Sequence, residues 1–538
     1  MIRQVQSTWQ GRSWRLGAIL AAGMLLAGCA GGGSPQPTAT ATTSDDGPVS
    51  GGVLVQTLPN DPGTLDMAVS TLQVTQTMGS NVFESLFALD KAFQPQPMLV
   101  DSVEMSDDRT VYTLGLRGGV TFHDGSELDS GDVAASLERF FTVSPSGAGV
   151  AADVVSVEAP DPLTVVITLA QPRHSLLGEL AASAALILPE EIATAAGANP
   201  LTGAQTIGTG PYQLGQYQTG QSVTLERFDE YSARAEGDWG GQAGMKHAYL
   251  DGIEFRFVAE DSTVVNGLTT GQWQMSAPSN DQYSVLQANP NITLTPIAGG
   301  VVNTVILNHH PDSAFADVEA RRALNLVINK EDMAAVSGTA PDLLTMTGAF
   351  QAPENAPLFS EAGTDVYESY DPERAKEQFA TAGVDTIRML VPSNFPQMVA
   401  WGNVLQQELT DIGLTVEIES YDLTTVRAKA TDEPGSWDLS LTFISGTVVA
   451  PPLINWLQQK YIGGYQNDEL DELFAEYAAA EDASAAKQVV DRIQQLVWDD
   501  IPSIVLYGSK QYVALDKSVK GFDGNFMLAL YNTWLDAS

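Results

Sequence analysis

The chain has 538 residues, enough for about three to four domain-sized units, and 44% of them are hydrophobic, which excludes a protein that is disordered throughout. Its single cysteine excludes a disulfide framework and any zinc site built from cysteines. With 66 Asp and Glu against 26 Lys and Arg, the formal charge of −40 argues against binding to nucleic acid or to anionic lipid, because both depend on Lys and Arg.

The first 28 residues have the composition of an export signal. Three arginines and no acidic residue precede an apolar run over 16–26, which at about 11 residues is too short to cross a bilayer as a helix. The run ends in Leu26-Ala27-Gly28-Cys29, which resembles the lipobox of bacterial lipoproteins. In that family the signal, here 1–28, is cut before a cysteine that then carries a diacylglycerol. We expect Cys29 to be lipidated, with a cleaved secretory signal and an incidental cysteine as the alternative.

Residues 29–50 are rich in Gly, Ser, Thr, Pro and Ala, and they are predicted to form a disordered tether because they offer little apolar surface to bury. No later stretch reaches the length of a transmembrane helix. The protein is therefore predicted to be extracytoplasmic and anchored to the outer face of the cell membrane through the lipidated cysteine alone.

Patterns of strands and helices alternate from residue 52 onward. Strands are predicted at 52–55, 111–116, 163–169, 223–227 and 253–258, with helices over 75–86 and after a cap at Ser130. The last third has helices after Asp317 and from Pro372 to Gly383, and a strand–helix–strand unit over 387–418 whose two strands should be parallel. A final helix over 489–497 precedes a strand at 504–506.

The sequence contains no recognisable catalytic pattern. Its five histidines, at 123, 174, 247, 309 and 310, lack HxxxH or HExxH spacing, and neither a GxSxG elbow nor a P-loop occurs. Pro211 follows Gly208-Thr209-Gly210 at once, which indicates a turn and not a phosphate loop. We therefore expect no catalytic residue, no metal and no cofactor. A binding protein fits better than an enzyme, although a catalytic carboxylate pair stays open because such pairs have no sequence spacing rule.

Several segments occur together in the order found in one family. They lie at 52–55, 65–66, 82–87, 112–120, 122–125, 132–139, 207–214, 249–253, 321–324, 370–375 and 412–414. Over residues 52–521 the chain thereby resembles the family 5 extracellular solute-binding proteins of ABC importers, the oligopeptide, dipeptide and nickel group. Most of these segments are interpreted as fold markers, including Phe122-His123-Asp124-Gly125.

The resemblance implies an α/β, two-lobed periplasmic-binding-protein-like fold of type II, in its large cluster C form. We expect an N-terminal lobe of residues 51–88, 205–302 and 505–538, an extra subdomain of 89–204 on that lobe, and a C-terminal lobe of 303–504. The implied function is an importer receptor that captures a small molecule or peptide between hinged lobes and delivers it to an ABC permease and its ATPases. We expect a monomer that binds no nucleic acid.

Matching positions within the family indicate which residues line the cleft. The candidates are Thr71, Gln73, Ser276, Asn303, Gln397, Asp422, Ile444, Ser445, Thr447 and Tyr507. Three of them, Ile444, Ser445 and Thr447, lie in 437–447, which resembles the ligand-gripping strand and loop of the family. Trp437, at the start of that segment, is interpreted as a core residue.

One departure from the family pattern concerns the ligand. Peptide-binding members have an Asp just after this strand that holds the α-ammonium of the peptide, and a buried charge needs such a partner. The corresponding segment here, 445–451, contains no acid. This absence argues against ordinary peptide binding unless Asp422 supplies the charge instead. Peptides remain the first expected ligand class on family resemblance alone, and an oligosaccharide, a nickel chelate or another polar compound is the alternative.

Two other classes of function remain open. A secreted hydrolase would change the mass of a bound compound, whereas a receptor would release it intact. A surface adhesion or sensing lipoprotein could use the same fold without a permease. Neighbouring permease and ATPase genes would distinguish an importer receptor from such a protein.

Overall fold

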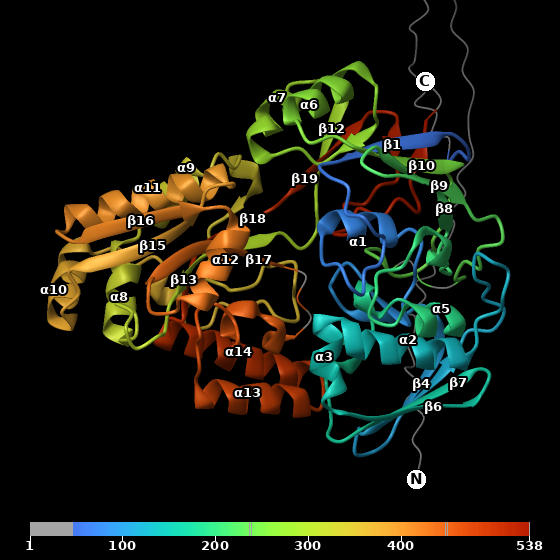
Figure 1. Cartoon of the computed structure of the whole chain (residues 1–538), viewed down its shortest axis with the longest axis horizontal. Coiled ribbons are helices and arrows are strands. Elements are labelled where there is room, and N and C mark those ends of the chain that lie inside the picture. The colour runs from blue at the N-terminus through green and yellow to red at the C-terminus, as the bar shows by residue number, and fades with distance from the viewer. Residues whose placement is uncertain (1–46, 236, 238, 447, 449, 537–538) are drawn as a thin grey trace, which may run out of the picture.

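Two helix-covered sheets organise the computed structural model, which describes residues 47–235, 237, 239–446, 448 and 450–536 (Figure 1). Each sheet forms the centre of one lobe, so the expected two-lobed α/β fold is confirmed. Within the described residues, no helix combines the length and apolar character needed to cross a bilayer. Cys29 and Thr447 lie outside the described residues.

The first lobe is built on a seven-stranded sheet. Its strand order is β12 (Ile292–Pro296), β19 (Tyr512–Asp516), β11 (Met275–Ser276), β1 (Val53–Leu58), β10 (Gly252–Phe257), β9 (Ser222–Arg227) and β8 (Tyr212–Gln218). The helices α1 (Gln73–Gly79), α6 (Asp261–Thr270) and α7 (Tyr283–Gln287) belong to this lobe, together with the short strand pair β20 (Val519–Lys520) and β21 (Trp534–Leu535).

A subdomain extends from the first lobe. Its antiparallel sheet has the order β4 (Val100–Met105), β5 (Val111–Leu116), β7 (Thr164–Leu169) and β6 (Val154–Asp161), beside a small pair, β2 (Phe87–Leu89) and β3 (Pro95–Pro97). Its helices are α2 (Ser130–Val143), α3 (Pro145–Ala151), α4 (Leu176–Glu179) and α5 (Glu190–Ala196). One hydrophobic core includes Leu54 and Phe255 of the first sheet as well as Leu114 of the subdomain, so the two parts pack as a single body.

The second lobe is built on a six-stranded sheet. Its order is β14 (Leu344–Thr345), β18 (Ser503–Ser509), β13 (Val301–Leu307), β17 (Leu439–Ser445), β15 (Thr386–Pro392) and β16 (Thr415–Tyr421). One core contains residues of α8 (Val318–Val327), α9 (Lys330–Val336), α10 (Pro372–Ala382) and α11 (Pro396–Asp411). Another contains residues of α12 (Leu423–Asp432), α13 (Asp468–Ala479) and α14 (Ala483–Asp500). Because both faces are covered, Val305 and Ile306 of β13 are both fully buried, on opposite faces.

The chain passes between the lobes at 297–300, which joins β12 to β13, and at 510–511, which joins β18 to β19. The two segments lie side by side, since the backbone N–H of Ile297 donates to the carbonyl of Gln511 at 2.8 Å. Gly300 has a φ of 50°, and a Cβ there would lie 2.9 Å from the carbonyl oxygen of Ser509. The expected boundaries at 302/303 and 504/505 therefore fall inside β13 and β18, because both strands pair within the second sheet.

Several elements predicted from local sequence patterns are confirmed. Asp317 caps α8 by accepting from the backbone N–H of Glu319 at 2.9 Å, and α10 begins at Pro372 and is followed by Gly383 at a φ of 70°. The strands β15 and β16 are parallel, as their strand–helix–strand pattern predicted. Trp437 is fully buried, which confirms its assignment to the core.

Two local predictions were wrong. The helix predicted over 75–86 ends at Gly79, because Asn81 is used for contacts with other parts of the chain. Its carbonyl accepts from the N–H of Tyr212 at 3.1 Å, and its side-chain oxygen accepts from the N–H of Leu530 at 2.8 Å. The cap of α2 is Asp129 and not Ser130, because Asp129 forms a reciprocal capping box with Asp132.

Candidate ligand-binding cleft

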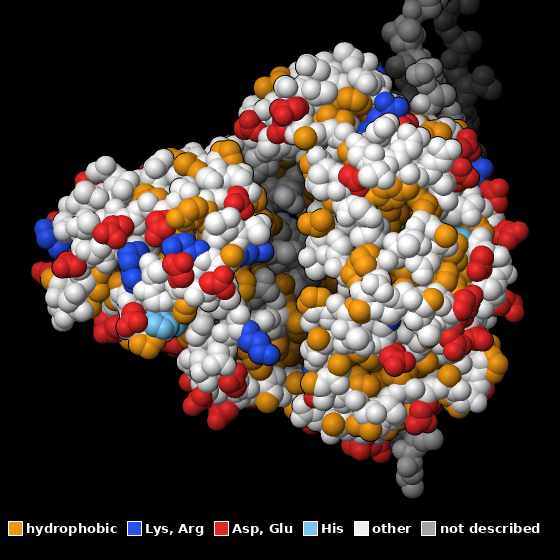
Figure 2. Space-filling model, viewed as in Figure 1, with side chains coloured by type: hydrophobic (Ala, Val, Ile, Leu, Met, Phe, Trp, Pro, Cys, Tyr) orange, Lys and Arg blue, Asp and Glu red, His pale blue; other side chains and the backbone are white. Residues whose placement is uncertain are grey.

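A cavity of about 480 Å³ lies between the lobes, where Figure 2 shows a hollow. The first lobe contributes Thr57, Leu58, Pro59, Gln73, Val74, Thr77, Ala277, Pro278, Ser279, Asn280, Ile297, Gln511, Tyr512, Phe526 and Leu528. The second contributes Val301, Asn303, Phe395, Gln397, Met398, Phe443 and Ser509. A solute in this space would contact both lobes, and its size falls in the range of small-molecule sites.

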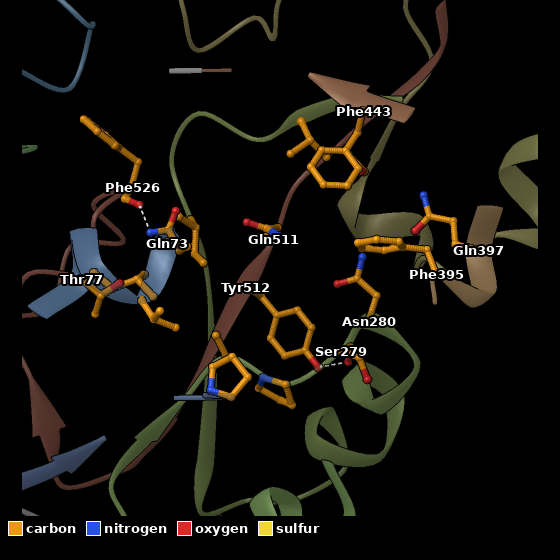
Figure 3. Close-up of a pocket in the computed structure, with 18 of the residues that line it drawn as sticks. Gln73, Thr77, Ser279, Asn280, Phe395, Gln397, Phe443, Gln511, Tyr512 and Phe526 are labelled. Carbon is orange, nitrogen blue, oxygen red and sulfur yellow. Dashed lines mark hydrogen bonds between the residues drawn. The ribbon is translucent and has the colours of Figure 1, made fainter. Parts of the chain in front are cut away.

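The wall from the first lobe is held by two side chain–backbone bonds (Figure 3). The amide of Gln73, at the start of α1, donates to the carbonyl of Phe526 at 3.2 Å. The hydroxyl of Tyr512 donates to the carbonyl of Ser279 at 2.9 Å, which fixes the loop after β11 against β19. Burial raises the pKa of Tyr512, so its phenol is neutral.

The wall from the second lobe centres on Gln397, near the start of α11. Its amide nitrogen donates to the side-chain oxygen of Asn303 at 3.1 Å and to the hydroxyl of Tyr507 at 3.3 Å. The amide nitrogen of Asn303 in turn donates to the hydroxyl of Ser509 at 3.0 Å. The pairing of β13 with β18 shifts register between Asn303 and Thr304, and such irregularities re-aim side chains. Burial raises the pKa of Tyr507 to about 12, so this network is uncharged at neutral pH.

Aromatic rings supply much of the apolar surface. The rings of Phe395 and Phe443 meet edge to face, with centroids 6.0 Å apart. Phe443 is 43% exposed, although it lies on a strand whose other described side chains are largely buried. An exposed Phe beside a cavity provides an apolar contact surface for a ligand.

The lining residues carry no Asp, Glu, Lys, Arg or His, so far as the chain is described. Acidic side chains are instead spread over the outer surface of both lobes (Figure 2). Within the described part, no group of three or more His, Cys, Asp and Glu side chains is arranged to hold a metal ion.

The predicted site residues fall into three groups. Gln73, Asn303 and Gln397 line the cavity, while Tyr507 lies buried beneath Gln397. Ser276 is fully buried and its hydroxyl lies 2.6 Å from that of Thr57, which lines the cavity. Thr71, Asp422, Ile444 and Ser445 are not among the lining residues.

Two of these placements have a clear physical reason. Asp422 is the N-cap of α12, and its carboxylate accepts from the backbone N–H groups of Thr424 and Thr425 at 3.0 and 3.1 Å. Ile444 packs into the core on the face of β17 opposite to Phe443, since successive side chains of a strand alternate. Family matching selected Ile444, whereas its neighbour Phe443 faces the cavity.

The sequence analysis missed the aromatic and amide residues Phe395, Phe443, Phe526, Tyr512, Asn280 and Gln511. For Phe443 a signal was available, because Leu439 and Leu441 share its face and pack in the core under α11. A third large apolar residue in that register can extend past the core into the cleft. No comparable pattern marks Asn280 or Gln511, which come from separate loops.

The histidine of the 122–125 segment is structural, as expected. The ring of His123 accepts from the backbone N–H of Gly208 at 3.2 Å and lies 2.9 Å from the carbonyl oxygen of Gly210. It thereby joins two of the family-like segments within the first lobe. Burial lowers its pKa, so the ring stays neutral.

The lobes also touch away from the strands that join them. Arg109 of the subdomain donates to the carbonyl oxygens of Ala479, at 2.8 Å, and of Ala480, where α13 ends. The backbone N–H of His174 donates to the carbonyl of Ala478 at 2.8 Å, and the His174 ring packs edge to face on Tyr477. A smaller cavity of about 280 Å³ adjoins this contact.

A cavity enclosed by two α/β lobes that are joined through paired strands defines a solute-capturing binding protein of the two-lobed class. Residues 94–462 match the family model described as bacterial extracellular solute-binding proteins, family 5 Middle. The chain belongs to this family, which confirms the resemblance seen in its sequence.

Known proteins agree with this assignment. The chain is 26% identical over 479 residues to the probable peptide ABC transporter periplasmic-binding protein y4tO of Sinorhizobium fredii, covering 85% of this chain and 88% of that protein. It is 26% identical over 494 residues to the glutathione-binding protein GsiB of Escherichia coli (strain K12), covering 85% and 89%. The solved structure of the ABC transporter substrate-binding protein CtaP of Listeria monocytogenes has a TM-score of 0.78 at 20% identity, covering 90% and 99%.

Proposed function

We propose that this protein is the extracytoplasmic receptor of an ABC importer, and that it captures a peptide or peptide-like solute between its lobes. The observation that carries this is the cavity lined from both lobes beside the two segments that join them. A ligand that bridges Gln397 and Gln511, one from each lobe, stabilises the closed arrangement by binding it more tightly than the open one. The permease then recognises the closed form.

The peptide-like class is supported by the relatives, since y4tO is named for peptide transport and GsiB for glutathione. Five side-chain amides in the cavity (Gln73, Asn280, Asn303, Gln397 and Gln511) can pair with amide groups of a ligand, because each offers both a donor and an acceptor.

Native mass spectrometry of the full-length protein, kept in detergent, tests the receptor function. We expect this measurement to show an intact compound that is released on unfolding. When the compound is added back to the emptied protein, the radius of gyration measured by small-angle X-ray scattering should fall. Accumulation of a chemically altered product, or no change in the scattering curve, would contradict the receptor function.

We further propose that the mature protein is a monomer attached to the membrane through a diacylglycerol on Cys29. The lipobox-like segment 26–29 supports the attachment. Replacing Cys29 with Ala should move the protein from the membrane fraction to the soluble fraction without changing ligand affinity. Light scattering coupled to size-exclusion chromatography tests the monomer.

A further inference from the structure

We propose that the cleft selects an uncharged, peptide-like solute whose ends are blocked or joined, so that it brings neither a free ammonium nor a free carboxylate into the cavity. This inference rests on the proposed receptor function and names the ligand class of the same site.

The first argument is the charge of the cavity. Tyr512 is the one described lining residue with an ionisable side chain, and its phenol is neutral because burial raises its pKa. An ionised group taken from water into such a site has no opposite charge to meet, so its desolvation weakens binding. A neutral ligand avoids this cost.

Charged residues that neighbour the lining in sequence are engaged elsewhere. Lys510, next to Gln511, forms an ion pair with Glu354 at 2.6 Å. Asp281, next to Asn280, accepts from the amide of Gln282 at 2.9 Å and from the hydroxyl of Ser279. Neither residue is among those that line the cavity, and the charge of Lys510 is already paired.

The second argument is the supply of unused amides. Over the described residues, the side-chain amides of Asn280 and Gln511 have no hydrogen-bond partner in the protein, and Figure 3 shows both beside the cavity. Gln397 donates through its nitrogen, which leaves its side-chain oxygen as an acceptor. Neutral groups that are both donor and acceptor suit peptide bonds, and they come from both lobes.

The third argument distinguishes a peptide-like ligand from a sugar. Twelve of the 22 lining residues are Ala, Val, Leu, Ile, Met, Phe or Pro, which have no polar side-chain atom. A sugar would leave many hydroxyls against these apolar groups without partners, at a cost for each buried unpaired hydroxyl. A peptide-like compound presents apolar side groups to Phe395 and Phe443 and amides to the polar side chains.

Four end forms of one Ala-Leu-Phe-Ala tetrapeptide test the proposal by calorimetry on the full-length protein in detergent. The forms have both ends free, only the amine acetylated, only the carboxyl amidated, or both ends blocked. We expect the doubly blocked form to bind at least about tenfold more tightly than the free form, with the singly blocked forms between them.

Two variants on one helix distinguish an effect of charge in the cavity from nonspecific peptide binding. Gln397→Glu places a carboxylate in the cavity, and it should shift the preference by about tenfold or more toward the amidated form with a free amine, relative to the doubly blocked form. Gln407→Glu makes the same change on the exposed side of α11 and should leave the preference unchanged. Asn303→Asp is a second cavity variant for the case in which Gln397→Glu does not fold.

Equal or tighter binding of the free form overturns the proposal, as does binding of cellobiose but of no peptide form. In either case the receptor function stands, because a ligand is still captured. A charged compound found in the purified protein by native mass spectrometry also overturns the proposal and leaves the receptor function intact.

Discussion

The guanidinium of Arg109 lies 2.8 Å from the carbonyl oxygen of Ala479, although the two residues are 370 positions apart. The first belongs to the subdomain and the second ends α13 of the other lobe. A cation at a helix C-terminus satisfies unpaired carbonyls and is favoured by the helix dipole. This contact holds the lobes together at a place where no strand joins them.

Replacing Arg109 with Ala should therefore favour a more open arrangement. We expect a larger radius of gyration for the ligand-free protein in small-angle X-ray scattering, and about a three- to tenfold weaker affinity for any solute that requires closure. Arg256→Ala, which removes a charge from the exposed surface of the first lobe, is the control and should change neither quantity. Scattering curves that coincide for Arg109→Ala and the parent would show that this contact does not govern closure.

Asp422 should act through its helix and not through the ligand. Replacing it with Asn keeps an N-cap side chain but removes the charge, so stability and solute affinity should both stay close to the parent values. Replacing it with Ala should lower the urea midpoint of unfolding, because the N–H groups of Thr424 and Thr425 lose their acceptor. A tenfold loss of affinity for an amine-bearing peptide in Asp422→Asn would instead place this carboxylate in the site.

The buried pair of Arg139 and Asp66 joins the subdomain to the first lobe, with 2.6 Å between nitrogen and oxygen. Replacing Arg139 with Met leaves the Asp66 carboxylate buried without its counter-charge, and it should lower the unfolding free energy of this lobe by about 3–5 kcal/mol. Urea unfolding followed by circular dichroism measures the change. The exposed Arg322, paired with Glu319 on α8, is the control, since its replacement by Met should cost less than about 1 kcal/mol. Equal losses of unfolding free energy in both variants would contradict a larger contribution of the buried pair to stability.

Glu408 on α11 should make stability depend on pH. Burial raises its pKa to about 7, although its carboxylate accepts from the backbone N–H of Asn329 at 3.0 Å. The folded state therefore binds a proton that the unfolded state has released, and stability is lost as pH rises from about 4.5 to about 7.

Glu408→Gln keeps the acceptor and removes this titration. The variant should gain at least about 1 kcal/mol relative to the parent between pH 5 and pH 7.5, measured from urea midpoints, after allowance for partial exposure. Lys330 faces the same region, and burial lowers its pKa to about 7, so it also makes stability depend on pH. The variant is therefore compared with the parent at the same pH, and the change of that difference with pH is the result. Glu373→Gln, exposed on α10, should show no such trend, and a flat difference for Glu408→Gln would refute the assignment.

The family-like segments of the sequence, interpreted there as fold markers, include residues that join distant parts of the fold. Asp66 and Arg139 come from two of these segments and form a buried ion pair. His123 and Gly208 come from two others, and the backbone N–H of Gly208 donates to the His123 ring. Three of the ten proposed site residues line the cavity and two more lie directly under its lining.

Sequence alone determined features that depend on residues close in the chain, such as the helix that follows Asp317, the helix start at Pro372 and the parallel strands of the strand–helix–strand unit β15–α11–β16. The tertiary structure decided what depends on distant partners: the end of α1 at Gly79, the choice of Phe443 over Ile444 for the cleft, and the contact of Arg109 with α13. A local pattern does not record these partners because they are distant in sequence, as Leu530 is from Asn81 and Ala479 is from Arg109.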